Sequence, residues 1–170
     1  LSKTAEKIGA VNCVTISKKK KLKGYNTDYH GFKKSIKPLL KDHHKKALIL
    51  GTGGASKAIA YALRSLKIEY DFVSRTADEF QYKYEELDAS IFEEYTIIIN
   101  TTPVGTHPNV DDCPNLDYSL FTKKHIAYDL IYNPEETAFL RKAKAQGAVT
   151  KNGYEMLVLQ AEKAWKIWNE

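Results

Sequence analysis

The sequence predicts an α/β protein built on a doubly wound parallel sheet with flanking helices. Two observations support this prediction. From residue 47 onward, short apolar runs alternate with segments of helical periodicity. The first of these runs leads into a glycine-rich turn, GTGGAS at 51–56, and a helical segment begins directly after it. A chain of 170 residues is long enough for one full domain of this class and too short for two large ones.

The sequence before residue 43 predicts a hairpin and one helix. The hairpin pairs strands at 10–16 and 24–26 across a lysine-rich tip. A helix is expected over residues 29–40, where apolar side chains recur at helical spacing. Its candidate capping residues are Asn26, Thr27 and Asp28.

The remaining residues predict the strands and helices of the sheet domain. The expected strands cover residues 47–50, 70–73, 97–99, 126–132 and 148–150. The expected helices cover residues 57–66, 134–146 and 154–168. The second of these helices is expected to start at Pro134, because proline is favoured in the first turn, and to stop before Gly147.

The glycine-rich turn is the main candidate for a binding site. Phosphate binding at a strand-to-helix turn needs a tight bend, a backbone free of side chains and an exposed helix N-terminus. Gly51, Gly53 and Gly54 supply these features, although Ser56 stands where the strict pattern has a third glycine. We therefore expect a Rossmann-like dinucleotide site. Its expected contacts at this turn are Gly51, Thr52, Gly53, Gly54 and Ala55.

The residues after the second strand of the sheet indicate which dinucleotide binds. An NAD site usually has an acidic residue there, which holds the ribose 2′-hydroxyl. This sequence has Ser74, Arg75 and Thr76, while Asp71 lies at the other end of the strand. Two hydroxyls and a guanidinium suit a 2′-phosphate, so NADP(H) is the expected cofactor.

Composition argues against several other functions. The net charge is +5, but the excess lysines lie at 18–23 and 41–46, without the interleaved aromatic residues typical of nucleic-acid binding. No apolar run approaches the roughly 20 residues that span a bilayer. Cys13 and Cys113 lie far apart, and the five histidines show no metal-ligand spacing. We expect a cytoplasmic enzyme that acts on a small-molecule substrate and has no nucleic-acid, membrane or metal partner. An oligomer is compatible with the sequence.

Seven short motifs, taken in order, resemble the shikimate dehydrogenase family over essentially the whole chain. They are IGAVN at 8–12, GYNTDYHG at 24–31, GTGGAS at 51–56, SRT at 74–76, NTTPVG at 100–105, DLIYNP at 129–134 with Thr137, and NGYEMLVLQ at 152–160. The resemblance implies the NADPH-dependent, reversible reduction of 3-dehydroshikimate to shikimate, a step toward chorismate and the aromatic amino acids.

The resemblance also implies roles for individual residues. The family uses a lysine and an aspartate as its acid/base pair, and the aspartate falls on Asp28. The positions that contact shikimate fall on Asn12, Asp28, Tyr132 and Gln160. Further cofactor positions fall on Asn100, Thr101, Thr102, Leu130 and Gly153.

The sequence departs from the family pattern in two respects. The catalytic lysine and the serines that hold the substrate carboxylate belong to an N-terminal substrate domain, and no lysine here lies in that motif. Ser74 replaces the usual asparagine, and Asp78 and Glu79 stand near the usual position of a second basic residue. We therefore expect the C-terminal, cofactor-binding part of a longer polypeptide, inactive alone. Its expected divisions are a remnant of the substrate domain at 1–25, a connecting helix at 26–42, the NADP-binding domain at 43–153, and a helix at 154–170 that packs back toward the missing domain.

Two alternatives share the same glycine turn. An NAD-dependent quinate/shikimate dehydrogenase is disfavoured by Ser74 and Arg75. A non-catalytic nucleotide-binding regulatory module is disfavoured by Asp28 and Gln160, because a nucleotide sensor needs no substrate contacts.

Overall fold

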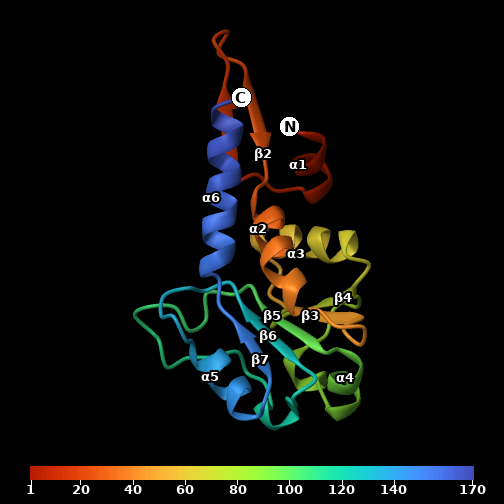
Figure 1. Ribbon diagram of the computed structural model, residues 1–170. Helices are drawn as coiled ribbons and strands as arrows, with labels where there is room; N and C mark the ends of the chain where they lie inside the picture. The colour runs from red at the N-terminus through yellow and green to blue at the C-terminus, as the bar shows by residue number, and fades with distance from the viewer.

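The computed structural model describes residues 1–170 and places a five-stranded sheet at one end of an elongated molecule (Figure 1). The strands are β3 (Lys46–Leu50), β4 (Glu69–Val73), β5 (Ile97–Asn100), β6 (Ile126–Asp129) and β7 (Val149–Lys151). Their order in the sheet is β4-β3-β5-β6-β7, and each neighbouring pair is parallel. The predicted fold class is confirmed.

Both faces of the sheet are buried, because successive side chains of each strand enter different cores. Ala47 and Ile49 of β3 pack in one core, and Leu48 and Leu50 pack in the other. The first core is covered by α2 (Asp28–Ile36), α3 (Gly54–Ser65) and α6 (Tyr154–Trp168). The second is covered by α4 (Ala89–Glu94) and α5 (Ala138–Ala145). Burial on both faces explains why the strands are continuous apolar runs rather than alternating ones.

The predicted hairpin is present and lies at the far end of the molecule from the sheet (Figure 1). It pairs β1 (Cys13–Ile16) with β2 (Leu22–Tyr25) in antiparallel register. The C-terminal helix α6 runs beside the hairpin, where Trp168 Nε1 donates to the Val14 carbonyl at 3.0 Å. It also packs closely on α2, because a Cβ at Gly31 would lie 2.5 Å from the Met156 carbonyl oxygen. None of the helices is long and apolar enough to cross a bilayer.

Several boundaries differ from the prediction, and three of them lie near the candidate site. Helix α5 begins at Ala138 rather than Pro134, because Thr137 provides the cap and accepts a hydrogen bond from Leu140 N. Strand β6 ends at Asp129, whose carboxylate accepts from Ile131 N and turns the chain out of the sheet. Helix α3 begins within the glycine turn, at Gly54.

Several short elements are absent from the prediction. They are α1 (Lys3–Ile8), α4, and the 3₁₀ helices η2 (Tyr84–Glu86) and η3 (Tyr118–Leu120), whereas η1 (Lys37–Leu39) forms the last turn of the helix predicted over residues 29–40. Helix α1 shows why they were missed. It is stabilised by the Ser2 cap and by burial of Ala5 and Ile8, which is too short a pattern to recognise as helical periodicity.

Candidate active site

The predicted cofactor residues gather at one edge of the sheet. Parallel strands bring the glycine turn after β3, residues 74–76 after β4, residues 101–102 after β5 and Leu130 after β6 to their shared carboxyl edge. The chain passes from β4 on one side of β3 to β5 on the other side. This edge is therefore a topological switch point, where open α/β sheets bind ligands.

The turn after β3 leaves open space beside the start of α3. Gly51 has φ +100°, and a Cβ there would lie 2.9 Å from side-chain atoms of Thr101 and Thr102, so the protein's own packing requires this glycine. A Cβ at Gly53 or Gly54 would meet nothing within 4 Å. Room above the first N–H groups of a helix fits a pyrophosphate, which a side chain at these positions would obstruct.

Ser56 occupies the position of the third glycine in the strict pattern. It is buried, and its hydroxyl donates to the Gly53 carbonyl at 2.6 Å. A small side chain that closes the turn is thus compatible with close packing of the helix at this position.

The loop after β4 presents an arginine without an acidic partner. Arg75 is exposed, and none of the ion pairs in the structure includes it. Ser74 is buried, and its hydroxyl accepts from Thr76 N at 3.2 Å. The Asp78 carboxylate is engaged within its own loop, where it accepts from Phe80 N at 2.9 Å. The guanidinium is therefore available to a phosphate.

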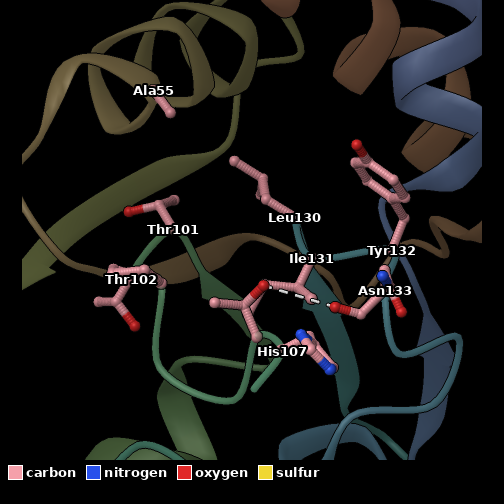
Figure 2. Close-up of a pocket in the computed structure, with 10 residues that line it drawn as sticks. Ala55, Thr101, Thr102, His107, Leu130, Ile131, Tyr132 and Asn133 are labelled. Carbon is pink, nitrogen blue, oxygen red and sulfur yellow. Dashed lines mark hydrogen bonds between the residues drawn. The ribbon is translucent and has the colours of Figure 1, made fainter. Parts of the chain in front are cut away.

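A pocket of about 600 Å³ lies between the loops that follow β5 and β6 (Figure 2). The predicted residues that line it are Ala55, Thr101, Thr102, Leu130 and Tyr132. The residues that sequence reasoning missed are Pro103, Thr106, His107, Ile131 and Asn133. Three of the missed residues lie inside the motifs at 100–105 and 129–134, so the motifs themselves held the signal. Thr106 Oγ1 donates to the Asn133 carbonyl at 3.4 Å, the dashed line in Figure 2.

A second cavity, of about 310 Å³, brings together all the residues predicted to contact substrate. They are Asn12, Asp28, Tyr132 and Gln160, and Leu130 and Gly153 line the same cavity. Ala55, Leu130 and Tyr132 line both cavities, so the two adjoin. The fold thus joins the hairpin, α2, α6 and the edge of the sheet into one continuous site.

Asp28 belongs to a hydrogen-bonded cluster in this second cavity. Asn12 Nδ2 donates to Asp28 Oδ1 at 2.8 Å, and Thr27 N donates to Asn12 Oδ1 at 2.8 Å. Thr27 Oγ1 donates to Gln160 Oε1 at 3.1 Å. Thr27 is fully buried, and the sequence predicts it only as a cap, although it stands inside the same motif.

The carboxylate of Asp28 does not cap its own helix. The backbone N–H of Tyr29 donates to Asn26 Oδ1 at 3.3 Å instead. Burial raises the pKa of Asp28, and the hydrogen bond from Asn12 lowers it by less. None of the ion pairs includes Asp28. Asp28 is thus a half-buried carboxylate that faces a cavity and has no ion-pair partner.

Contacts within the protein explain the presence of two of the predicted cofactor residues, Gly153 and Asn100. A Cβ at Gly153 would lie 1.8 Å from the Leu130 carbonyl oxygen, so this glycine lets α6 begin directly against the loop after β6. Asn100 is fully buried, and its Oδ1 accepts from both N and Oγ1 of Thr102 at 3.0 and 2.6 Å. The Asn100 side chain thus shapes the loop that follows β5, and its contact with a cofactor stays a prediction.

The parallel sheet, the open turn at its switch point and the adjoining cavities define a Rossmann-like dinucleotide-binding protein. No family model matches the chain. Shikimate dehydrogenase (NADP(+)) of Caldanaerobacter subterraneus subsp. tengcongensis is 41% identical over an alignment of 186 residues, which covers 99% of this chain and 65% of the relative. The chain belongs to the shikimate dehydrogenase family.

Solved structures agree with this assignment. The shikimate dehydrogenase of Aquifex aeolicus superposes with a TM-score of 0.84 at 37% identity, over 98% of this chain and 64% of that one. The enzyme of Thermus thermophilus, solved with NADP(H) and shikimate, gives a TM-score of 0.82 at 35% identity, over 98% of this chain and 65% of that one. The chain thus spans about 65% of the length of its relatives.

Proposed function

We propose that the chain is the NADP(H)-binding part of an enzyme that reversibly reduces 3-dehydroshikimate to shikimate. The observation that carries this proposal is the pair of adjoining cavities. One lies beside the loops at the carboxyl edge of the sheet, and the other is lined by Asn12, Asp28, Tyr132 and Gln160. Ala55, Leu130 and Tyr132, which line both, would lie where a nicotinamide meets the substrate.

The residues at the sheet edge fit NADP(H). The start of α3 at Gly53 and Gly54 would bind the pyrophosphate, and Arg75 would bind the 2′-phosphate together with the neighbouring hydroxyls. Leu130 and Gly153 would lie beside the nicotinamide. When bound, the cofactor supplies the hydride for the substrate carbonyl carbon.

Asp28 would take part in proton transfer to and from the substrate oxygen. Reduction of a ketone needs a proton at that oxygen as the hydride arrives at carbon. The raised pKa of Asp28 makes its neutral form more accessible, and Asn12 holds the carboxyl group in the cavity. The family's partner lysine has no counterpart beside Asp28 within residues 1–170. We therefore expect these residues alone to bind NADPH without turnover.

Titration of the 170-residue chain with NADPH and with NADH tests the proposal, with cofactor fluorescence as the readout. We expect NADPH to bind more tightly, because a charge-assisted bond to the 2′-phosphate contributes about 1.5–3 kcal/mol. Arg75→Ala should weaken NADPH about ten- to a hundredfold and leave NADH nearly unchanged. The matched control is Arg64→Ala, an exposed arginine in the last turn of α3. The proposal would be contradicted if neither NADPH nor NADH binds. It would also be contradicted if this chain alone oxidises shikimate.

The second candidate is an NAD-dependent quinate/shikimate dehydrogenase. Asp78 and Glu79 favour it, because they place negative charge in the loop that carries Arg75. Equal affinities for NADH and NADPH, together with equal losses in Arg75→Ala, would support this candidate over the first.

A further inference from the structure

Asp129 is a fully buried carboxylate at the end of β6 that the proposed chemistry does not use. Its Oδ1 accepts from Ile131 N at 3.0 Å and from Asn100 Nδ2 at 3.1 Å. Its Oδ2 accepts from Thr137 Oγ1 at 2.7 Å. None of the ion pairs includes it. Burying a carboxylate without a cation is costly, so this residue needs an explanation.

The hydrogen bond to Asn100 joins the ends of two neighbouring strands. Asn100 and Asp129 are register partners on β5 and β6. The chain after Asn100 carries Thr101 and Thr102 to the first cavity, and the chain after Asp129 carries Leu130 to both cavities. The hydrogen bond between Asp129 and Asn100 therefore connects the starts of these two loops.

A carboxylate at this position also decides which way the Asn100 amide points. A carboxylate only accepts hydrogen bonds, so it selects the orientation in which Asn100 Nδ2 faces Asp129. Asn100 Oδ1 then faces Thr102, whose backbone N–H and hydroxyl both donate to it. An amide turned the other way would present N–H groups to the Thr102 N–H, and the loop would lose that backbone bond.

We propose that Asp129 is a positioning residue that holds the cofactor-binding loop at residues 101–105 in place through Asn100. This inference rests on the proposed function, since it assigns a ligand to that loop. The bond from Thr137 serves a different purpose, because Thr137 is the cap of α5. The bonds from Asn100 and from Thr137 can therefore be tested separately.

The decisive variant is Asp129→Ser in the 170-residue chain. A serine hydroxyl can still accept from the N–H two residues on, which preserves the turn at Ile131, but it is too short to reach Asn100. We expect this variant to weaken NADPH about tenfold, the loss of roughly one good hydrogen bond. Asp129→Asn keeps an oxygen that can accept from Asn100, so its affinity for NADPH should stay within about threefold of that of the original chain.

Thr137→Val is the matched control. It removes the other bond of Asp129 and the α5 cap, so it should lower the melting temperature while leaving NADPH affinity within about twofold. A merely structural role for Asp129 predicts instead that affinity follows stability in every variant. Combining Asp129→Ser with Asn100→Ala should weaken NADPH no further than the more severe single variant, because both break one link.

Hydrogen exchange at the Thr102 amide gives a readout that does not depend on cofactor. Exchange should quicken in Asp129→Ser and in Asn100→Ala, but not in Thr137→Val. If the original chain binds no dinucleotide, the proposed function fails while this readout still tests the link. Unchanged exchange in either loop variant overturns the inference, and so does equal weakening of NADPH by Thr137→Val. If Asp129→Ser does not fold, Asp129→Thr carries the same two expectations, because its hydroxyl can also accept from Ile131 N and is likewise too short to reach Asn100.

Discussion

Asp28 is half-buried and Asp129 is fully buried, and their partners give them different properties. Asp28 accepts one hydrogen bond, from Asn12, and faces a cavity. Asp129 accepts bonds from Asn100, Ile131 and Thr137 and faces none. The first carboxyl group is free to exchange a proton with a ligand, whereas the second is committed to holding protein groups.

Asp28→Asn separates proton transfer from cofactor binding. The amide preserves the shape of the side chain but cannot exchange a proton, so turnover in the enzyme that carries this chain should fall about 10²- to 10⁴-fold. NADPH affinity should stay within about twofold, because Asp28 lines the second cavity and not the turn after β3. Steady-state kinetics with shikimate, together with an NADPH titration, provide the measurement. Unchanged turnover would show that Asp28 is not the acid/base group.

The free energy of unfolding should depend on pH through the titration of Asp129. Burial raises the pKa of Asp129 from 3.8 to about 6, despite its hydrogen bonds. The folded state therefore prefers the protonated form. The stability that Asp129 contributes is fully present below the unfolded pKa and is lost as the pH rises through about 6. The change amounts to at most about 3 kcal/mol.

A comparison with Asp129→Asn isolates this titration. His44 and His125 have pKa values lowered by burial, so their contribution to stability falls as the pH drops, in the same window. These histidines are common to both proteins and cancel in the difference. The free energy of unfolding of the original chain, relative to Asp129→Asn, should decrease between pH 4 and pH 7. A difference that is flat across this range would contradict the assignment.

At the scale of elements, the glycines around the site are required for two different reasons. Gly153 is required by packing, since a Cβ would meet the Leu130 carbonyl. Gly54 is the first residue of α3 and has open space around it. Only the second kind of glycine indicates a ligand.

Gly54→Ala should therefore move stability and binding in opposite directions. Alanine favours a helix over glycine by roughly 0.5–1 kcal/mol, so the melting temperature should stay the same or rise. The added methyl group would lie where the pyrophosphate approaches, so NADPH should bind at least about tenfold more weakly. Gly153→Ala, as the contrast, should lower the melting temperature sharply. Full NADPH affinity in Gly54→Ala would mean that the phosphates do not approach this turn.

Local patterns predicted the parts of the fold that depend on neighbouring residues. The strands, the glycine turn and helix α6 follow from apolar runs and turn chemistry within a few positions, and the structure confirms them. The start of α5 could not be predicted in this way. Both Pro134 and Thr137 are good helix starts, and the hydrogen bond from Thr137 to the buried Asp129 distinguishes them only in three dimensions.

The same limit applies to the candidate site. Motifs located Asp28 and Gln160, but the link between them runs through Thr27, which looks like an ordinary cap in the sequence. Thr106 and His107 line the first cavity because the chain folds back there after β5, and they lie just beyond the motif at 100–105. A role that depends on a tertiary contact produces no characteristic spacing in the sequence, so it cannot be predicted from spacing.

At the scale of the whole molecule, the hairpin and α6 extend well beyond the sheet (Figure 1). They are nonetheless joined to it by close packing. Helix α6 begins against Leu130, and its Met156 belongs to the core that includes Phe32 of α2 and Ile59 of α3. The second cavity is lined from both sides of this junction, so its shape depends on the two parts folding together.

This packing predicts one cooperative unfolding transition for all 170 residues, with a response to NADPH that includes the hairpin end. At a free concentration one hundred times its Kd, NADPH should raise the free energy of unfolding by about 2.7 kcal/mol. Calorimetry should show a single transition that shifts as a whole, and hydrogen exchange should slow in α6 as well as in β3 and β5. The effect of NADPH should be much smaller in Arg75→Ala at the same concentration, because its Kd is weaker. Two transitions, of which NADPH shifts only one, would show that α6 and the hairpin unfold separately from the sheet. The second cavity would then be formed by parts that move independently.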